Sequence, residues 1–193
     1  MPAPIPRHRF RYGSAELDLG EDLLAPWFEK HPSKKSALLA PGYWATYGVP
    51  DGLLTIMDLS VADARNLRTG LRSVTGDVWP EPDDRVMTWL SRLLVLPQGR
   101  GCTVLEIRKG RLTAERGFDE AGFHKFKEEQ FEYFCLTDDY EALKAAARLD
   151  FERLEQEARR KDAGRGYRTF DSAAFDRSVA GNILLHCREL LAD

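Results

Sequence analysis

The fold is decided by the stretch CTVLEIRKGRLTAER, residues 102–116. It contains two runs of alternating apolar and polar residues around Lys109-Gly110, a pattern typical of a β-hairpin with a two-residue turn. Apolar pairs share one face in this register and polar pairs share the other: Ile107–Leu112 with Leu105–Ala114, and Glu106–Thr113 with Arg108–Arg111. We therefore expect a small antiparallel sheet with Leu105, Ile107 and Leu112 buried on one face.

Toward the N-terminus, short apolar runs alternate with proline and glycine turns. Prolines at positions 2, 4 and 6 favour an extended arm over residues 1–8. Short strands are expected at 9–12 and 53–57. Apolar residues at helical spacing predict helices at 23–30, 61–73 and 83–96, the last with Trp89 on its buried face.

Toward the C-terminus, the pattern becomes helical, with helices expected from Asp119, over 137–163 and over 172–191. The long amphipathic helix at 137–163 carries apolar residues three or four positions apart: Tyr140, Leu143, Ala147, Phe151, Leu154 and Ala158. Such a seam suits either packing within the domain or a homodimer. We expect one compact α+β domain over residues 1–193, with a small antiparallel sheet and a mostly helical C-terminal half.

The composition excludes several classes of protein. A chain that is 43% hydrophobic can bury a core, which excludes disorder. The chain has 28 basic and 31 acidic residues, and neither half has the basic surplus that a nucleic-acid binder needs. Arg7–Tyr12 interleaves cations and rings as single-strand binders do, but acidic residues follow at once, so nucleic acid is not the expected partner.

The three cysteines indicate a reducing compartment. Their number is odd and no CxxC pair occurs, so we expect free thiols and no zinc site. Residues 1–13 lack the apolar region of a signal peptide, and no apolar run is long enough to span a bilayer. The sequence therefore predicts a soluble cytoplasmic protein without a membrane partner.

Asp58 is the first candidate for chemistry. It follows an apolar run and precedes an expected helix, and a carboxylate at the end of a strand can bind a metal or act as a general base. The alternative is structural, because Asp58 and Ser60 together could cap the helix at 61–73. The sequence supplies no second ligand beside Asp58.

His124 and Glu128 are a second candidate, since they lie four residues apart on an expected helix and Cys135 continues roughly the same face. Two helical ligands can begin a metal site, but there is no HExxH pattern and no third ligand. The alternative is an exposed ion pair beside a buried cysteine. We expect no metal and no cofactor.

Three rings form the strongest candidate for a binding site. Tyr43, Trp44 and Tyr47 lie between the turns Pro41-Gly42 and Pro50-Asp51-Gly52. Tyr and Trp carry much of the binding energy at protein interfaces. The segment could instead tuck into the core as a strand. Both alternatives, partner surface and core, remain open at this stage.

Two function classes fit these observations. The first is a cytosolic protein-binding module, such as an immunity-type inhibitor of a toxin or an accessory subunit of a bacterial assembly. The second is a small hydrolase or transferase whose site is assembled around Asp58 and His124. The chain has no GxSxG, GxxxxGK[ST] or GxGxxG motif, which favours the binding module.

Overall fold

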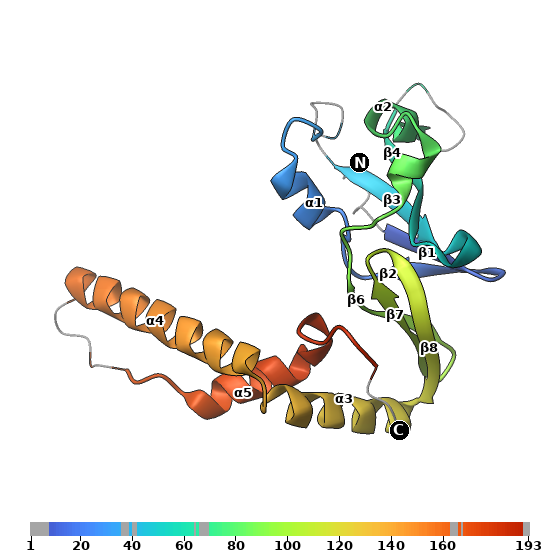
Figure 1. Cartoon of the computed structure of the whole chain (residues 1–193). Coiled ribbons are helices and arrows are strands. Elements are labelled where there is room, and N and C mark those ends of the chain that lie inside the picture. Colours follow the sequence, from blue (N-terminus) through green and yellow to red (C-terminus); the bar gives the residue numbers. More distant parts are fainter. Residues whose placement is uncertain are drawn as a thin grey trace. The chain divides into compact units, whose positions relative to one another are not determined.

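The computed structural model describes residues 8–35, 39, 42–63, 65, 70–162, 166 and 168–190. Contacts divide the chain into two units, Met1–Gly117 and Phe118–Asp193. The first unit holds two β-sheets and the second holds helices (Figure 1). The α+β class with a helical C-terminal half is therefore confirmed, whereas a single domain over the whole chain stays a prediction. Of the predicted arm at 1–8, all but His8 lies outside the described residues.

A five-stranded sheet forms most of the first unit, with strand order β2-β1-β3-β4-β5 (Figure 1). Its strands are β1 (His8–Tyr12), β2 (Ala15–Leu19), β3 (Tyr43–Gly48), β4 (Thr55–Ala62) and β5 (Leu71–Ser73). β1 and β3 run parallel, and the other neighbouring pairs are antiparallel. The strand expected at 9–12 is confirmed, and the one expected at 53–57 begins at Thr55 and continues to Ala62.

Side chains alternate between the two faces of this sheet because successive residues of a strand point in opposite directions. Phe10, Tyr47 and Ile56 are fully buried on the core face. Trp44 lies on the other face, since both of its neighbours in β3 are buried. Asp58 shares that outer face, because it pairs with Thr46 in the β3–β4 register.

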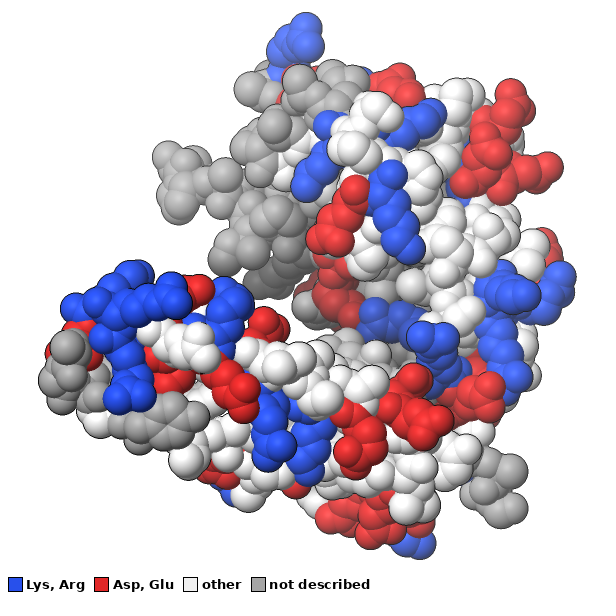
Figure 2. Space-filling view, turned by 60° about the vertical axis from the view of Figure 1, so that its left-hand side comes forward, with Lys and Arg blue, Asp and Glu red and all other residues white. Residues whose placement is uncertain are grey.

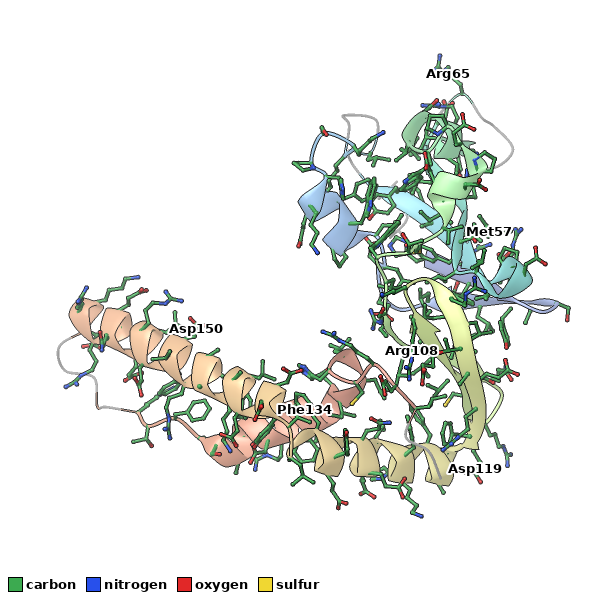
Figure 3. The ribbon with its side chains drawn as sticks, in the orientation of Figure 1. Met57, Arg65, Arg108, Asp119, Phe134 and Asp150 are labelled. Atoms are coloured by element: carbon green, nitrogen blue, oxygen red, sulfur yellow. The ribbon has the colours of Figure 1, made fainter. Side chains whose placement is uncertain are left out.

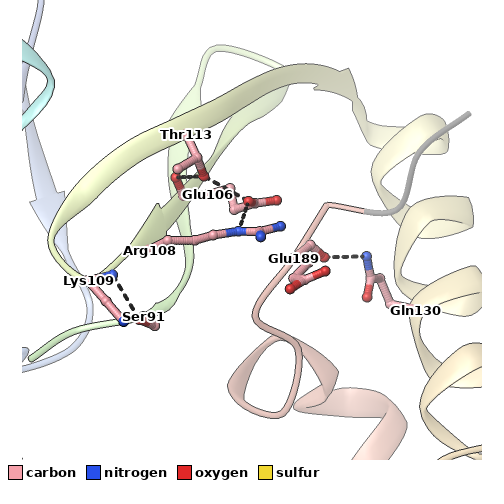
Figure 4. A network of polar contacts seen from close by, with 7 residues as sticks. All are labelled: Ser91, Glu106, Arg108, Lys109, Thr113, Gln130 and Glu189. Carbon is pink, nitrogen blue, oxygen red and sulfur yellow. Dashed lines mark hydrogen bonds and ion pairs between the residues drawn. The ribbon is translucent and has the colours of Figure 1, made fainter.

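The second sheet contains the hairpin that the sequence predicts. Its strands are β6 (Arg92–Gln98), β7 (Gly101–Arg108) and β8 (Arg111–Asp119), in that order. Thr113 donates its hydroxyl to the Glu106 carboxylate at 2.7 Å, as the predicted register requires (Figure 4). Leu105 and Ile107 are fully buried, and Leu112 packs partly buried against the same core. The hairpin and its buried face are thus confirmed.

One core joins the two sheets, since apolar side chains of both belong to a single buried cluster. Short helical elements link the strands: α1 (Ala25–Lys30), η2 (Pro50–Gly52), α2 (Thr75–Val78) and η3 (Pro82–Arg85). α1 confirms the helix expected at 23–30 and buries Phe28, while α2 buries Val78. Both helices therefore close the core of the first unit.

Two predicted helices are wrong. The one over 61–73 fails because Val61 pairs with Arg72 between β4 and β5, so strand pairing overrides the helical spacing. The one over 83–96 fails because Pro82–Arg85 form a single 3-10 turn and Arg92–Gln98 form β6. β6 buries side chains on both faces, and such a strand is a continuous apolar run that periodicity cannot distinguish from a helix.

The second unit contains three α-helices and a final 3-10 turn. They are α3 (Glu120–Phe134), α4 (Asp138–Lys161), α5 (Ser172–Gly181) and η4 (Ile183–Leu185). A side chain caps each α-helix by accepting a backbone N–H in the first turn: Asp119, Thr137 and Asp171. The predicted starts are confirmed. The helix predicted over 172–191 ends early, at Gly181, because glycine favours a helix end.

Aromatic contacts hold this unit together. Phe134, near the end of α3, packs edge-on against Tyr140 of α4 and stacks on His186, with ring centroids 5.9 and 5.3 Å apart (Figure 3). Tyr140 donates its hydroxyl to Asp176 of α5 at 2.7 Å. α3, α4 and α5 are therefore linked through Tyr140.

The predicted apolar seam of α4 packs partly within its own unit. Tyr140 is buried, and Phe151 packs against Phe170 at 6.0 Å, whereas Leu154 is 56% exposed. Tyr140 and Glu155 are the buried side chains of α4. Most of this helix, which is about 36 Å long, is therefore exposed.

Candidate functional site

Asp58 lies at the centre of a small hydroxyl cluster on the outer face of the five-stranded sheet. Its carboxylate accepts hydrogen bonds from Ser60 at 2.5 Å, from Ser73 at 2.6 Å and from Thr75 at 3.2 Å. The Thr75 hydroxyl in turn accepts the backbone N–H of Leu59 at 2.7 Å. These contacts join β4, β5 and the start of α2. The helix that Asp58 was expected to cap is absent from the described part of 61–73, and a role for Asp58 in chemistry stays a prediction.

His124 and Glu128 are brought together by α3, but Cys135 is not brought to them. The His124 Nδ1 and a Glu128 carboxylate oxygen are 3.3 Å apart, and both side chains are largely exposed. They line an open groove of about 490 Å³ between α3 and the end of α5. Cys135 instead lies near Tyr140 and Asp176, where burial raises the pKa of its thiol.

The described residues contain no group of three or more His, Cys, Asp or Glu side chains that could hold a metal ion. The two residues proposed for an enzyme belong to different units, Asp58 to the first and His124 to the second. The contacts of each are made within its own unit. A site assembled around both residues stays a prediction.

The three rings of β3 do not form one surface. Tyr43 and Tyr47 are buried, so the core alternative holds for both, whereas Trp44 is half-buried on the opposite face. Strand alternation separates them. Burial raises the pKa of both tyrosines, and the nearby Asp22 carboxylate acts in the same direction. A partner-binding role for Trp44 stays a prediction.

Asp22 ties Tyr43 to the start of α1. The Tyr43 hydroxyl donates to one Asp22 carboxylate oxygen at 2.5 Å, and the other oxygen accepts the backbone N–H of Leu24 at 2.9 Å. The His8 ring lies beside both groups, with Nε2 3.8 Å from Asp22. Since α1 begins at Ala25, these contacts fix where its side chains project.

Three of the chain's four tryptophans gather on the first unit, and the sequence did not predict this. Trp27 of α1 lies 5.2 Å from Trp79 and 5.6 Å from Trp89, measured between ring centroids, and it stacks on His31 at 4.4 Å. Trp79 is buried, Trp27 is half-buried and Trp89 is 38% exposed. We call these four residues the tryptophan surface.

Backbone contacts hold the loop that carries Trp89 in place. Met87 is fully buried and donates its N–H to Leu54 at 2.9 Å, and Leu90 accepts the N–H of Gly110 at 2.9 Å. The hydroxyl of Ser91 accepts a third N–H, from Lys109 (Figure 4). Trp89 therefore projects from a loop that is held by hydrogen bonds before and after it. Because this loop is already ordered, it would lose little conformational entropy when a partner binds.

Sequence reasoning missed the tryptophan surface for a physical reason. Its residues come from α1, from the end of α2 and from the loop before β6, and no local pattern links the three segments. Trp89 was also expected on the buried face of the helix over 83–96, which does not form. Two of the tryptophans stand next to a proline in the sequence, at Pro26-Trp27 and Trp79-Pro80. This pattern predicts a turn at each position, but it does not predict that the rings meet.

Compared with known proteins, this chain matches no family model, no curated protein and no solved structure. Among the residues that the structure describes, no helix combines the length and apolar character needed to cross a bilayer.

Proposed function

We propose that this chain is a protein-binding module and that the tryptophan surface is its contact site. The observation that carries the proposal is the packing of Trp27, Trp79 and Trp89 against one another with Trp89 left exposed. Tryptophan is among the residues that dominate binding energy at interfaces, because it buries a large, rigid ring. An exposed tryptophan ring that packs on two other tryptophan rings can serve as an anchor residue for a partner protein.

Preorganisation supports the same proposal. The Trp89 loop is fixed by Gly110 and Lys109, and α1 is fixed through Asp22. A partner that covers Trp89 would therefore order little of the chain, and more of the contact energy would appear as affinity. An immunity-type inhibitor and an accessory subunit are two forms that a module of this kind can take.

The alternative, a small hydrolase or transferase, has less support. The Asp58 carboxylate already accepts hydrogen bonds from three hydroxyls of the chain itself, and His124 is an exposed side chain paired with Glu128. We therefore propose a binding role and not a catalytic one.

The test uses the intact chain to capture its partner from cells that encode it, followed by affinity measurements with the purified partner. Replacing Trp89 by alanine should weaken binding by about 2 kcal/mol, which is roughly 30-fold in Kd. The matched control is Trp44→Ala, which removes a half-buried tryptophan from the outer face of the sheet. This control should bind as the wild type does.

Melting curves of both variants accompany the affinities. An unchanged Kd for a folded Trp89→Ala protein would overturn the proposed contact site. A loss confined to Trp44→Ala would also overturn it and would move the site to the outer face of the five-stranded sheet. A loss confined to Trp89→Ala supports it.

A further inference from the structure

One face of α4 is exposed along its entire length. Asp138, Leu149 and Arg160 are spaced eleven residues apart, and eleven residues are close to three helical turns, so they lie on one line along the helix. The exposed residues on and beside this line form what we call the outer stripe: Asp138, Ala142, Ala145, Ala146, Leu149, Arg153, Gln156 and Arg160.

The outer stripe is apolar at its centre. Leu149 is 67% exposed and lies next to the exposed methyl groups of Ala145 and Ala146. A helix is stabilised mainly by packing of an apolar face, and α4 buries few side chains in its own unit. The stripe differs from the seam around Tyr140 and Phe151, which packs within the unit.

The charges of α4 are arranged with opposite signs at its two ends. The first turn carries Asp138, Asp139 and Glu141, and the last turn carries Arg159, Arg160 and Lys161. Figure 2 shows a gathering of Lys and Arg side chains at one end of the helical unit. Asp150 lies midway along the helix and is bridged by Arg153 at 3.4 Å, so the middle of the helix carries charges of both signs (Figure 3).

We propose that the outer stripe is a self-association surface, on which the α4 helices of two copies of this chain pack antiparallel about a two-fold axis at Leu149. Leu149 is equidistant in sequence from Asp138 and Arg160. An antiparallel pair centred there places each Asp138 beside Arg160 of the second copy. A parallel pair would place like charges together at both ends, which disfavours it.

Small side chains make this packing sterically feasible. Ala145 and Ala142 lie opposite Arg153 and Gln156 of the second copy, whose methylene groups can cover the alanine methyls. Alanines allow two helix axes to approach to about 8 Å, the near end of the range for packed helices. One leucine and three alanines per copy make a short interface, so the dimer dissociates on dilution.

The test is sedimentation equilibrium of the full chain over a range of concentrations. The wild type should show a monomer–dimer equilibrium. Replacing Leu149 by aspartate puts two carboxylates at the two-fold axis and should raise the dimer Kd at least tenfold. The control Arg177→Asp makes a charge change at an exposed position of α5, off the outer stripe, and should leave the Kd within a factor of two.

Charge exchange tests the pairing itself. Arg160→Asp alone and Asp138→Arg alone should each weaken the homodimer, because each places like charges opposite each other. Mixing the two variants should restore a dimer that contains one copy of each. A single chain carrying both substitutions should dimerise about as tightly as the wild type. The single variants distinguish the two arrangements, because in a parallel pair each position faces its own copy and neither substitution changes the number of like-charge contacts.

The dimer does not depend on the tryptophan surface, so either proposal can fail alone. Wild-type protein that stays monomeric up to millimolar concentration would overturn self-association. Dimerisation unaffected by Leu149→Asp would assign the dimer to another face and overturn the role of the outer stripe. Failure of the double variant to recover would overturn the antiparallel arrangement.

Discussion

Gly110 donates its backbone N–H to the carbonyl of Leu90 at 2.9 Å, so the turn of the β7–β8 hairpin holds the loop that presents Trp89. The same residue accepts the N–H of Leu54 at 2.7 Å. One turn residue thus connects the hairpin with the residue that precedes β4 and with the loop that carries Trp89. We therefore expect a substitution in this turn to affect both the stability of the fold and the position of Trp89.

Replacing Gly110 by alanine should destabilise the protein and move Trp89. Gly110 has φ +75°, and an added Cβ would lie 2.8 Å from the Met87 backbone. We expect a loss of about 2 kcal/mol or more in the free energy of unfolding, measured by urea denaturation, together with a change in tryptophan fluorescence of the folded state.

The matched control is Gly99→Ala in the β6–β7 turn. Gly99 also has a positive φ, +56°, but nothing lies within 4 Å of an added Cβ. Its replacement should cost about 1 kcal/mol from backbone strain alone, with unchanged fluorescence. Equal losses for the two variants would show that the contact with Met87 is unimportant.

The hydroxyl cluster of Asp58 should matter for stability. Asp58→Ala leaves the hydroxyls of Ser60, Ser73 and Thr75 without their shared acceptor, and we expect a loss of about 1–3 kcal/mol. Asp58→Asn keeps one acceptor oxygen and should lose less. If both variants melted as the wild type does, the cluster would not hold β5 to β4, and a functional role for Asp58 would gain support.

Acidification should weaken the fold through His8. Burial lowers the pKa of His8, and the Asp22 carboxylate offsets this only in part. The unfolded chain therefore binds more protons, so the contribution of His8 is complete above about pH 6.5 and is lost as pH falls through its folded pKa. The rings of Tyr43 and Tyr47 also face His8. Both hydroxyls stay neutral over this pH range, because burial raises the pKa of each.

The measurement is the free energy of unfolding from pH 7.5 to pH 5. His8→Gln removes the titrating ring, so its stability should fall less over this range than that of the wild type. If the free energy of unfolding fell by the same amount for both proteins over this range, the pKa of His8 would be the same in the folded and the unfolded chain.

The three thiols should differ in reactivity. Cys102 and Cys187 are buried, whereas Cys135 is half-buried and therefore more accessible to a reagent. Burial raises the pKa of Cys187 to about 11 and also raises the pKa of Cys135. At pH 8 a thiol reagent should modify Cys135 in the native protein and all three cysteines after denaturation. Cys135→Ser should abolish the native reaction. Fewer than three equivalents in denatured, unreduced protein would reveal a disulfide.

Features encoded by neighbouring residues could be predicted. The register around Lys109-Gly110 follows from alternation over fifteen residues, and the starts of α3 and α4 follow from the capping side chains Asp119 and Thr137. Both depend on contacts between residues close in sequence. The interactions that stabilise the hairpin turn and the helix starts can already form within a short segment of the chain.

Features that depend on distant contacts could not be predicted. β6 reads as a helix because both of its faces are buried, and its strand character comes from pairing with β7. Tyr43 and Tyr47 belong to the core because β3 lies inside the sheet, between β1 and β4. The tryptophan surface likewise exists only once three segments have met. In each case the deciding partner lies outside any local window of sequence.

The parallel pairing of β1 with β3 has a consequence for synthesis on the ribosome. His8 of β1 contacts Ala45 of β3 across a separation of 37 residues, and translation at about 5–20 residues per second delays β3 by roughly 2–7 s. During that interval the β1–β2 hairpin can form, but the apolar side chains of Phe10 and Leu19 have no sheet to cover them. The β1–β2 hairpin is therefore a segment that a chaperone would need to shield until β3 has been made.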